Sequence, residues 1–411
     1  MALNRDFWLF AVGRFVSQLG WAVQDVALPL YVLDKTHSGS TMTVFILAEM
    51  IPALIVMPFA GVIGDRYNRK HLMVGFDLAR GILLFGVLAF GLLSIHQLLA
   101  VQVIMATMGA FFGTSTSAMF PDLVEQEELE RANSIVGSLN ILARLVGPAL
   151  GGFIYAVGGI SLALLINAVS FFGSGIFEMM IRYEWNAREL EDLTQVVSDL
   201  KEGLAFLMSN SYLKTLMGFA VFMIALAQPF AAVLMPYAMR EVLKFSSYQF
   251  GLQESAFMTG ALIGNVLIAT KFGRKAGKYL FHALFLNGIL ILVFSWMISP
   301  FADLSPSDVF LLLAGVNVLW GAASTFVDVP ITAKIQRAVP SEIRSRVFSA
   351  MVVLMHSSGP LGLLAVGPLL DRFPAWEVSL GLGAGMGVIV LYYYMRHGKI
   401  LTREEAEKLL K

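Results

Sequence analysis

The sequence predicts an all-α integral membrane protein with twelve transmembrane helices in two pseudo-symmetric six-helix bundles. Three observations predict this class: the composition, the number of long apolar segments, and features that recur in the two halves of the chain. Hydrophobic residues make up 57% of the 411 residues and charged residues 14%, whereas soluble domains have roughly 45–50% and about 25%. The composition therefore favours a membrane-spanning chain over a soluble enzyme.

A helix that crosses a membrane needs about 20 mostly apolar residues. Twelve segments meet this requirement, in two groups of six that flank a polar stretch at 183–212. The predicted spans are 7–33, 43–64, 72–93, 97–120, 134–157 and 161–182, then 213–239, 248–270, 279–298, 307–330, 345–370 and 375–395. We therefore predict an N-terminal bundle at 1–182, a cytoplasmic linker at 183–212, a C-terminal bundle at 213–396 and a cytoplasmic tail at 397–411.

The basic residues indicate how these spans are oriented. Of the 29 Lys and Arg residues, 22 fall in loops on the side of the termini, four in the opposite loops and three within spans. Loops rich in Lys and Arg remain in the cytoplasm. We therefore expect a multi-pass protein of the cell inner membrane with both termini in the cytoplasm.

The linker and the repeated features complete the predicted architecture. Within the linker, apolar residues recur at the spacing of an amphipathic helix that lies on the membrane surface; they are Leu190, Leu193, Val197, Leu200 and Leu204. A Gly-Pro pair occurs in the fifth span at Gly147 and again in the eleventh at Gly359. Two related six-helix halves are typical of transporters with a site between the halves.

A charged motif follows the second predicted span. Its glycines permit close helix approach, its aspartate can accept hydrogen bonds at a helix N-terminus, and its basic residues can pair with acids across the cytoplasmic face. Asp77 and Arg80 in the next span lie i, i+3 apart near the same end and are read as part of this network. We interpret seven residues as a cytoplasmic gate motif: Gly61, Asp65, Arg66, Arg69, Lys70, Asp77 and Arg80.

This motif resembles the signature of the major facilitator superfamily, G-x-x-x-D-R-x-G-R-R. Asn68 stands at the second Gly of that signature, a mild departure because Asn tolerates the left-handed backbone conformation. The stretch from Pro121 to Val124 and the one from Asp199 to Gly203 resemble the branch that holds macrolide efflux proteins and the enterobactin exporter. The resemblance implies secondary active transport by alternating access, with export of an amphipathic molecule in exchange for protons.

A second motif lies in the fifth span, where four residues resemble the glycine-proline antiporter motif of drug exporters in the same superfamily. These residues are Gly147, Pro148, Gly151 and Gly152. Close packing of two membrane helices would by itself explain such glycines. A role specific to antiport is the alternative that the resemblance adds.

Ionisable residues inside the spans are the remaining candidates, because each costs roughly 2.5–3.5 kcal/mol on insertion scales. Asp25 and Glu49 fall in the outer parts of the first two spans, and we predict that they face each other across a cavity as the proton-coupling site. The alternative is a cavity wall or an interhelical hydrogen bond. Arg144, near mid-depth, needs a carboxylate or an anionic ligand. We assign a substrate or counter-ion role to Arg14, Arg144, Glu254 and His356.

Apolar side chains could complete the site. Phe, Trp and Met are abundant, and soft walls of this kind suit varied amphipathic ligands. We expect a minority of the following to line a pocket: Trp21, Phe45, Phe222, Phe230, Met235, Phe257, Trp320 and Phe326.

The sequence also excludes several function classes. It has no cysteine, no His pair at i, i+4 and no ATP-binding loop of the type G-x-x-x-x-G-K-[ST], which excludes thiolate sites, helical zinc sites and an ATP-driven pump. We expect no catalytic residue, metal or cofactor, an H⁺ gradient (alternatively Na⁺) as the driving force, a small amphipathic substrate, contact with membrane lipids, no nucleic acid and a monomer. The alternatives are an importer or a lipid or lysolipid flippase, and, less favoured, a membrane-bound enzyme.

Overall fold

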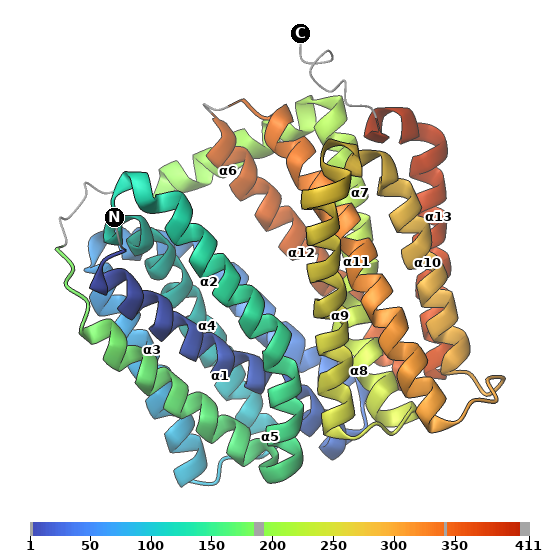
Figure 1. The fold of residues 1–411 in the computed structure, drawn as a ribbon, viewed down its shortest axis with the longest axis horizontal. Helices are drawn as coiled ribbons and strands as arrows, with labels where there is room; N and C mark the ends of the chain where they lie inside the picture. The colour runs from blue at the N-terminus through green and yellow to red at the C-terminus, as the bar shows by residue number, and fades with distance from the viewer. Residues whose placement is uncertain (1–2, 185–192, 341–342, 403–411) are drawn as a thin grey trace. The chain divides into compact units, whose positions relative to one another are not determined.

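The computed structural model describes residues 3–184, 193–340 and 343–402, without the side chains at 58, 61–66, 193–196, 274, 345 and 399–402. Within these ranges every regular element is a helix, so the predicted all-α class is confirmed (Figure 1). The end of the predicted tail, residues 403–411, lies outside the described residues.

The helices follow the predicted spans closely. The first part of the chain forms α1 (Arg5–Thr36), α2 (Gly39–Arg66), α3 (Arg69–Ala89), α4 (Ile95–Met119), the short 3₁₀ turns η1 (Phe120–Leu123) and η2 (Gln126–Glu128), and α5 (Leu129–Met179). The second part begins with α6 (Leu193–Ser209), α7 (Ser211–Pro229), η3 (Phe230–Leu234), α8 (Met235–Tyr237) and η4 (Ala238–Val242). It continues with α9 (Ser247–Leu267), η5 (Ile268–Phe272), η6 (Gly273–Tyr279), α10 (Leu280–Met297), α11 (Pro306–Ala338), α12 (Arg344–Leu370) and α13 (Ala375–Thr402).

Ten helices in the described part of the chain are long and apolar enough to cross a membrane. One of them contains α5, whose 51 residues bend at Gly159, where φ is +61°. The two parts of α5 on either side of this glycine correspond to the fifth and sixth predicted spans. The 32-residue α1, which carries Arg14 and Asp25, is outside the ten. The described helices are therefore compatible with twelve crossings.

The chain divides into two compact units. Unit 1 contains Met1–Thr36, Val44–Leu193 and Ser246–Ser255, and unit 2 contains His37–Thr43, Thr194–Phe245 and Ala256–Lys411. These units are groups of mutual contacts, so the predicted domain boundaries at 182, 213 and 396 stay predictions.

Unit 1 is built around α1, which packs along α5. Gly147 abuts Ala22 of α1, and a side chain at Gly151 would meet the backbone of Val23 at 3.0 Å. A buried hydrogen bond of 2.7 Å from Asn167 to Gln24 joins the same two helices. The glycine-proline motif is therefore a site where two helices approach closely, and its antiport role stays a prediction.

The start of α3 shows why Asn68 replaces glycine in the signature. Its backbone is not left-handed, since φ is −58° and ψ is 114°, so that expectation is wrong. The Asn68 side chain instead accepts hydrogen bonds from the backbone N–H groups of Lys70 (3.0 Å) and His71 (3.4 Å). An N-cap satisfies N–H groups that lack partners in the first helical turn, which glycine cannot do.

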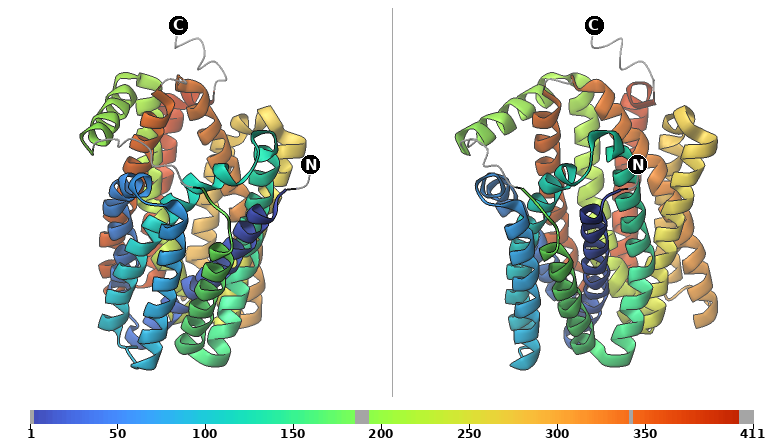
Figure 2. Two further views of the ribbon diagram at one scale, coloured as in Figure 1. Left: turned by 90° about the vertical axis from the view of Figure 1, so that its left-hand side faces the viewer. Right: turned by 60° about the vertical axis from the view of Figure 1, so that its left-hand side comes forward.

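Unit 2 has its own core, formed by α7, α10, α11, α12 and α13 around fully buried residues such as Leu213, Leu280 and Val347. Helix α6 meets the beginning of α12 and extends sideways from it (Figure 2). The Arg346 side chain on α12 reaches Asp199 at 2.9 Å and Glu202 at 2.7 Å on α6.

Helix α6 forms within the predicted linker. Gly203 lies against the backbone of Arg346, which permits the close approach of α6 to α12. Val197 and Leu204 remain exposed, as expected of an amphipathic helix at a membrane surface.

Candidate functional site

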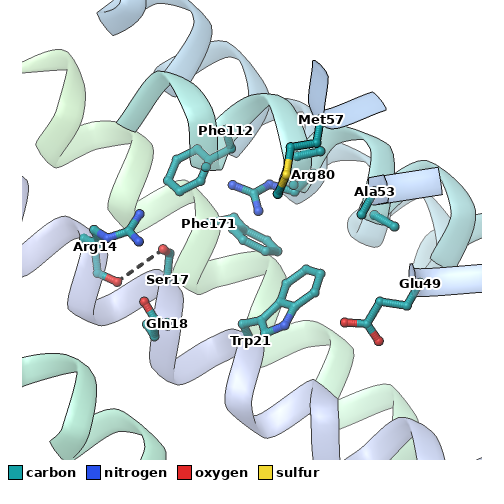
Figure 3. A pocket seen from close by; sticks show the side chains of 14 residues that line it. Arg14, Ser17, Gln18, Trp21, Glu49, Ala53, Met57, Arg80, Phe112 and Phe171 are labelled. Atoms are coloured by element: carbon teal, nitrogen blue, oxygen red, sulfur yellow. Dashed lines mark hydrogen bonds between the residues drawn. The ribbon is translucent and has the colours of Figure 1, made fainter. Parts of the chain in front are cut away.

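A pocket of about 350 Å³ lies inside unit 1, between five helices (Figure 3). Apolar and small side chains form most of its wall, with a few polar groups among them, as is typical of small-molecule sites. Its lining residues are Arg14, Ser17, Gln18 and Trp21 from α1, Glu49, Ala53 and Met57 from α2, Arg80 from α3, Ala106, Gly109, Ala110, Phe112 and Gly113 from α4, and Phe171 from α5.

Arg80 is a built-in part of the pocket wall. Its guanidinium carbon lies 4.3 Å from the ring centres of both Phe112 and Phe171, an arrangement favoured by the ring quadrupoles. The guanidinium also forms an ion pair with Asp77, one helical turn earlier on α3. Arg80 is 4% exposed and Asp77 fully buried, so neither charge is free.

Glu178 adds a second buried carboxylate to this cluster. It is 1% exposed and accepts a hydrogen bond of 3.1 Å from Ser174. One oxygen each of Asp77 and Glu178 has no hydrogen-bond partner in the part of the chain that the structure describes. Arg14 interacts electrostatically with both acids. Two cations and two carboxylates from α1, α3 and α5 thus balance, which a buried cluster requires.

Glu49 marks the other end of the pocket in Figure 3. It accepts a hydrogen bond of 3.1 Å from the neutral amide of Gln102 on α4. Asp25, one helical turn beyond Trp21 on α1, interacts electrostatically with Glu49 and with Arg144, and the Trp21 side chain hydrogen-bonds to it. Asp25 and Glu49 thus lie close enough to interact, and the side chains of Asp25 and Arg144 are exposed at the surface of their helices. Their proton-coupling role stays a prediction.

The other two predicted substrate residues are not among those that line this pocket. Glu254 on α9 is half-buried and has no hydrogen bond or ion pair to any residue that the structure describes. His356 on α12 is exposed, and its Nδ1 lies 2.9 Å from the carbonyl of Val352. Across the described ranges, no three His, Asp or Glu side chains gather as they would at a metal site.

The gate motif separates into two places. Arg69, at the start of α3, pairs with Asp122 of η1 at 3.2 Å, and Tyr183 donates a hydrogen bond of 2.9 Å to the same carboxylate. Burial, followed by the hydrogen bond to Asp122, raises the pKa of Tyr183, which keeps it a donor. Asp77 and Arg80 belong instead to the pocket cluster.

The remaining gate residues are less defined. Gly61 lies in α2, and the side chains of Asp65 and Arg66 are outside the described residues. Lys70 is half-buried in the first turn of α3.

The aromatic residues of the pocket were only partly predictable. Trp21 lines it, but Phe45 and Phe230 are buried in the packing and Phe222 is exposed. Phe112 and Phe171 were missed because apolar positions on a membrane helix look alike in sequence. Gln102 was also missed, although a polar residue in an apolar span was a signal for it.

Comparison with known proteins agrees with this arrangement. The sequence profile of the Major Facilitator Superfamily matches residues 10–363. The chain is 25% identical over 372 residues to macrolide efflux protein A of Streptococcus pyogenes, covering 89% of each chain. It is 27% identical over 379 residues to the multidrug efflux pump Tap of Mycobacterium tuberculosis, covering 89% of this chain and 87% of that one.

Solved structures show the same fold. The crystal structure of the nucleoside transporter NupG superimposes with a TM-score of 0.71 at 13% identity, over 95% of this chain and 98% of the other. The protein is thus a multi-pass membrane transporter and not an enzyme. The superfamily profile matches most of the chain, the structure is compatible with twelve helical crossings, and efflux pumps are among the relatives. The chain therefore belongs to the major facilitator superfamily.

Proposed function

We propose that this transporter exports a small amphipathic molecule by alternating access, in exchange for protons. The observation that carries the proposal is the position of Glu49, which lines an aromatic pocket and lies in electrostatic contact with Asp25. Ionisable groups inside membrane spans mark substrate paths and proton relays. A carboxylate in this position can hold either a proton or a positively charged group of the substrate. Exchange of protons for substrate requires that the two compete for the same site.

The pocket wall supports an amphipathic substrate. Trp21, Met57, Phe112 and Phe171 supply polarisable surfaces that adapt to apolar bodies of different shape. Both efflux relatives favour export over uptake.

In this proposal the protein lies in the cell inner membrane with both termini in the cytoplasm, as the distribution of Lys and Arg supports. It acts as a monomer. It needs no cofactor, since the H⁺ gradient supplies the free energy for transport. Na⁺ is the alternative driving ion.

The test is flux in proteoliposomes with an imposed pH gradient, screened with lipophilic cations, macrolides, catechol siderophores and lysolipids. We expect substrate to move against the proton flow, a protonophore to stop it, and a Na⁺ gradient alone not to drive it. Asp25→Asn and Glu49→Gln should each abolish proton-driven flux. Glu128→Gln, the same type of change in an exposed ion pair with Arg131, should retain it.

Two results would contradict the proposal. Full proton-dependent transport in both Asp25→Asn and Glu49→Gln would remove these carboxylates from the coupling mechanism. Lysolipid movement that needs no ion gradient would instead indicate a flippase.

A further inference from the structure

The two arginines of the pocket in unit 1 differ in how their charge is used. The Arg80 guanidinium forms an ion pair with Asp77 and lies between two phenyl rings. The Arg14 guanidinium, in contrast, makes no hydrogen bond and no salt bridge with any residue of the described ranges, while its carbon lies 6.0 Å from the ring centre of Phe112. Arg14 lines the pocket, and its guanidinium carries five N–H donors.

The charges near Arg14 leave its donors available. The nearest acids are Asp77 on α3 and Glu178 on α5, which interact with it electrostatically but form no salt bridge with it. Their own contacts go to Arg80 and Ser174. The Arg14 guanidinium cannot lose its charge by deprotonation, and it lacks a bidentate partner. It therefore favours an acidic group on the ligand.

The opposite end of the pocket has the opposite character. Among the residues that the structure describes, Glu49 has only the neutral amide of Gln102 as a hydrogen-bond partner, so its carboxylate can accept a charged donor. Between Arg14 and Glu49 lie Trp21 and Phe171 (Figure 3). Among the described residues, the pocket thus has a guanidinium without a hydrogen-bonded partner at one end, a carboxylate bound to a neutral amide at the other, and an aromatic wall between them.

We propose that this pocket selects zwitterionic amphiphiles, with the acidic group of the ligand on Arg14, its basic group on Glu49 and its apolar body against the aromatic wall. The inference rests on the proposed function in one respect, namely that this pocket is the substrate site. It adds the charge class of the substrate and makes Arg14 the residue that determines specificity for an acidic group.

The test compares two dyes of nearly the same shape, rhodamine B, which is a zwitterion with a free carboxylate, and its methyl ester, which is a cation. Fluorescence anisotropy with the purified protein in lipid nanodiscs measures both affinities. We expect the wild-type protein to bind rhodamine B about tenfold more tightly than the ester, as charge-assisted hydrogen bonds predict. Arg14→Gln should bring the two affinities to within about twofold of each other, with little change for the ester.

The variants separate this role from a structural one. Arg14→Lys keeps the charge and should retain most of the preference for rhodamine B. Glu49→Gln should weaken both dyes, since both carry the cationic xanthene. Arg131→Gln, which removes an exposed guanidinium on α5 outside the pocket, should leave both affinities unchanged. The acid and ester comparison on the wild-type protein stands even if Arg14→Gln does not fold.

Equal binding of the two dyes to the wild-type protein, or no binding of either, would overturn the proposal. An unchanged preference in Arg14→Gln would show that another group holds the carboxylate. These outcomes are distinct from a failure of the proposed function, because proton-driven flux and its loss in Asp25→Asn are measured independently of the dye preference.

Discussion

The buried ion pair between Asp77 and Arg80 permits a quantitative test of the pocket cluster. In Asp77→Asn, the Arg80 guanidinium loses its paired carboxylate while it stays 4% exposed between two phenyl rings. An arginine cannot shed its proton to escape this situation. Breaking a buried pair in this way costs about 3 kcal/mol or more.

This cost should be visible in thermal unfolding. At roughly 2–4 °C per kcal/mol for a unit of this size, about 3 kcal/mol corresponds to a fall of about 6–12 °C in the apparent Tm. Tryptophan fluorescence of the protein in mild detergent measures it. The double variant Asp77→Asn with Arg80→Met removes the unpaired cation and leaves an apolar side chain between the rings, so it should recover more than half of the loss.

The control is Glu128→Gln, the same change of carboxylate to amide in an exposed pair, which should cost less than about 1 kcal/mol. The reasoning is refuted if Asp77→Asn costs no more than this control. It is also refuted if the effects of Asp77→Asn and Arg80→Met simply add, because a coupled pair cannot give additive losses.

Three further predictions concern helix contacts and caps. Gly147→Leu should lower the free energy of unfolding by about 1–3 kcal/mol by separating α1 from α5. Gly137, which faces open space on the same helix, is the control, and Gly137→Leu should have little effect on the Tm. Equal losses would contradict the packing role. Arg346→Gln should change stability by less than about 1 kcal/mol but should speed protease cleavage within α6, since this helix loses two ion pairs. Unchanged cleavage would argue against α6 docking through Arg346. Asn68→Ala should cost about 1 kcal/mol in unfolding experiments and Asn68→Gly only a few tenths; a stabilising Gly would favour the left-handed interpretation that the backbone contradicts.

The architecture was predictable because the membrane imposes it. Backbone groups in lipid must be satisfied within the chain, so long apolar segments become helices, and the helix bounds of α2, α4 and α9 follow the predicted spans to within a few residues. The close helix contact in the fifth span was also predictable, because glycines in membrane helices permit such contacts. Gly147 indeed lies against Ala22 of α1.

The site was predictable in its residues but not in its pairings. Charged residues within spans stand out against their apolar background, so Arg14, Glu49 and Arg80 were identified as candidates from sequence alone. Their distances along the chain do not indicate which of them meet. Sequence placed Arg80 in a gate with Asp77, and the structure places it in a pocket wall.

The sequence by itself therefore determined which segments form helices, how long their apolar stretches are, and which few charged residues lie within the membrane. Only the tertiary structure decided that Arg80 forms an ion pair with Asp77 while the Arg14 guanidinium forms none with the described residues, because that difference depends on the rotation and packing of α1, α3 and α5. Helix rotation is set by contacts between residues far apart in the chain. A single sequence read along its length does not contain those contacts explicitly.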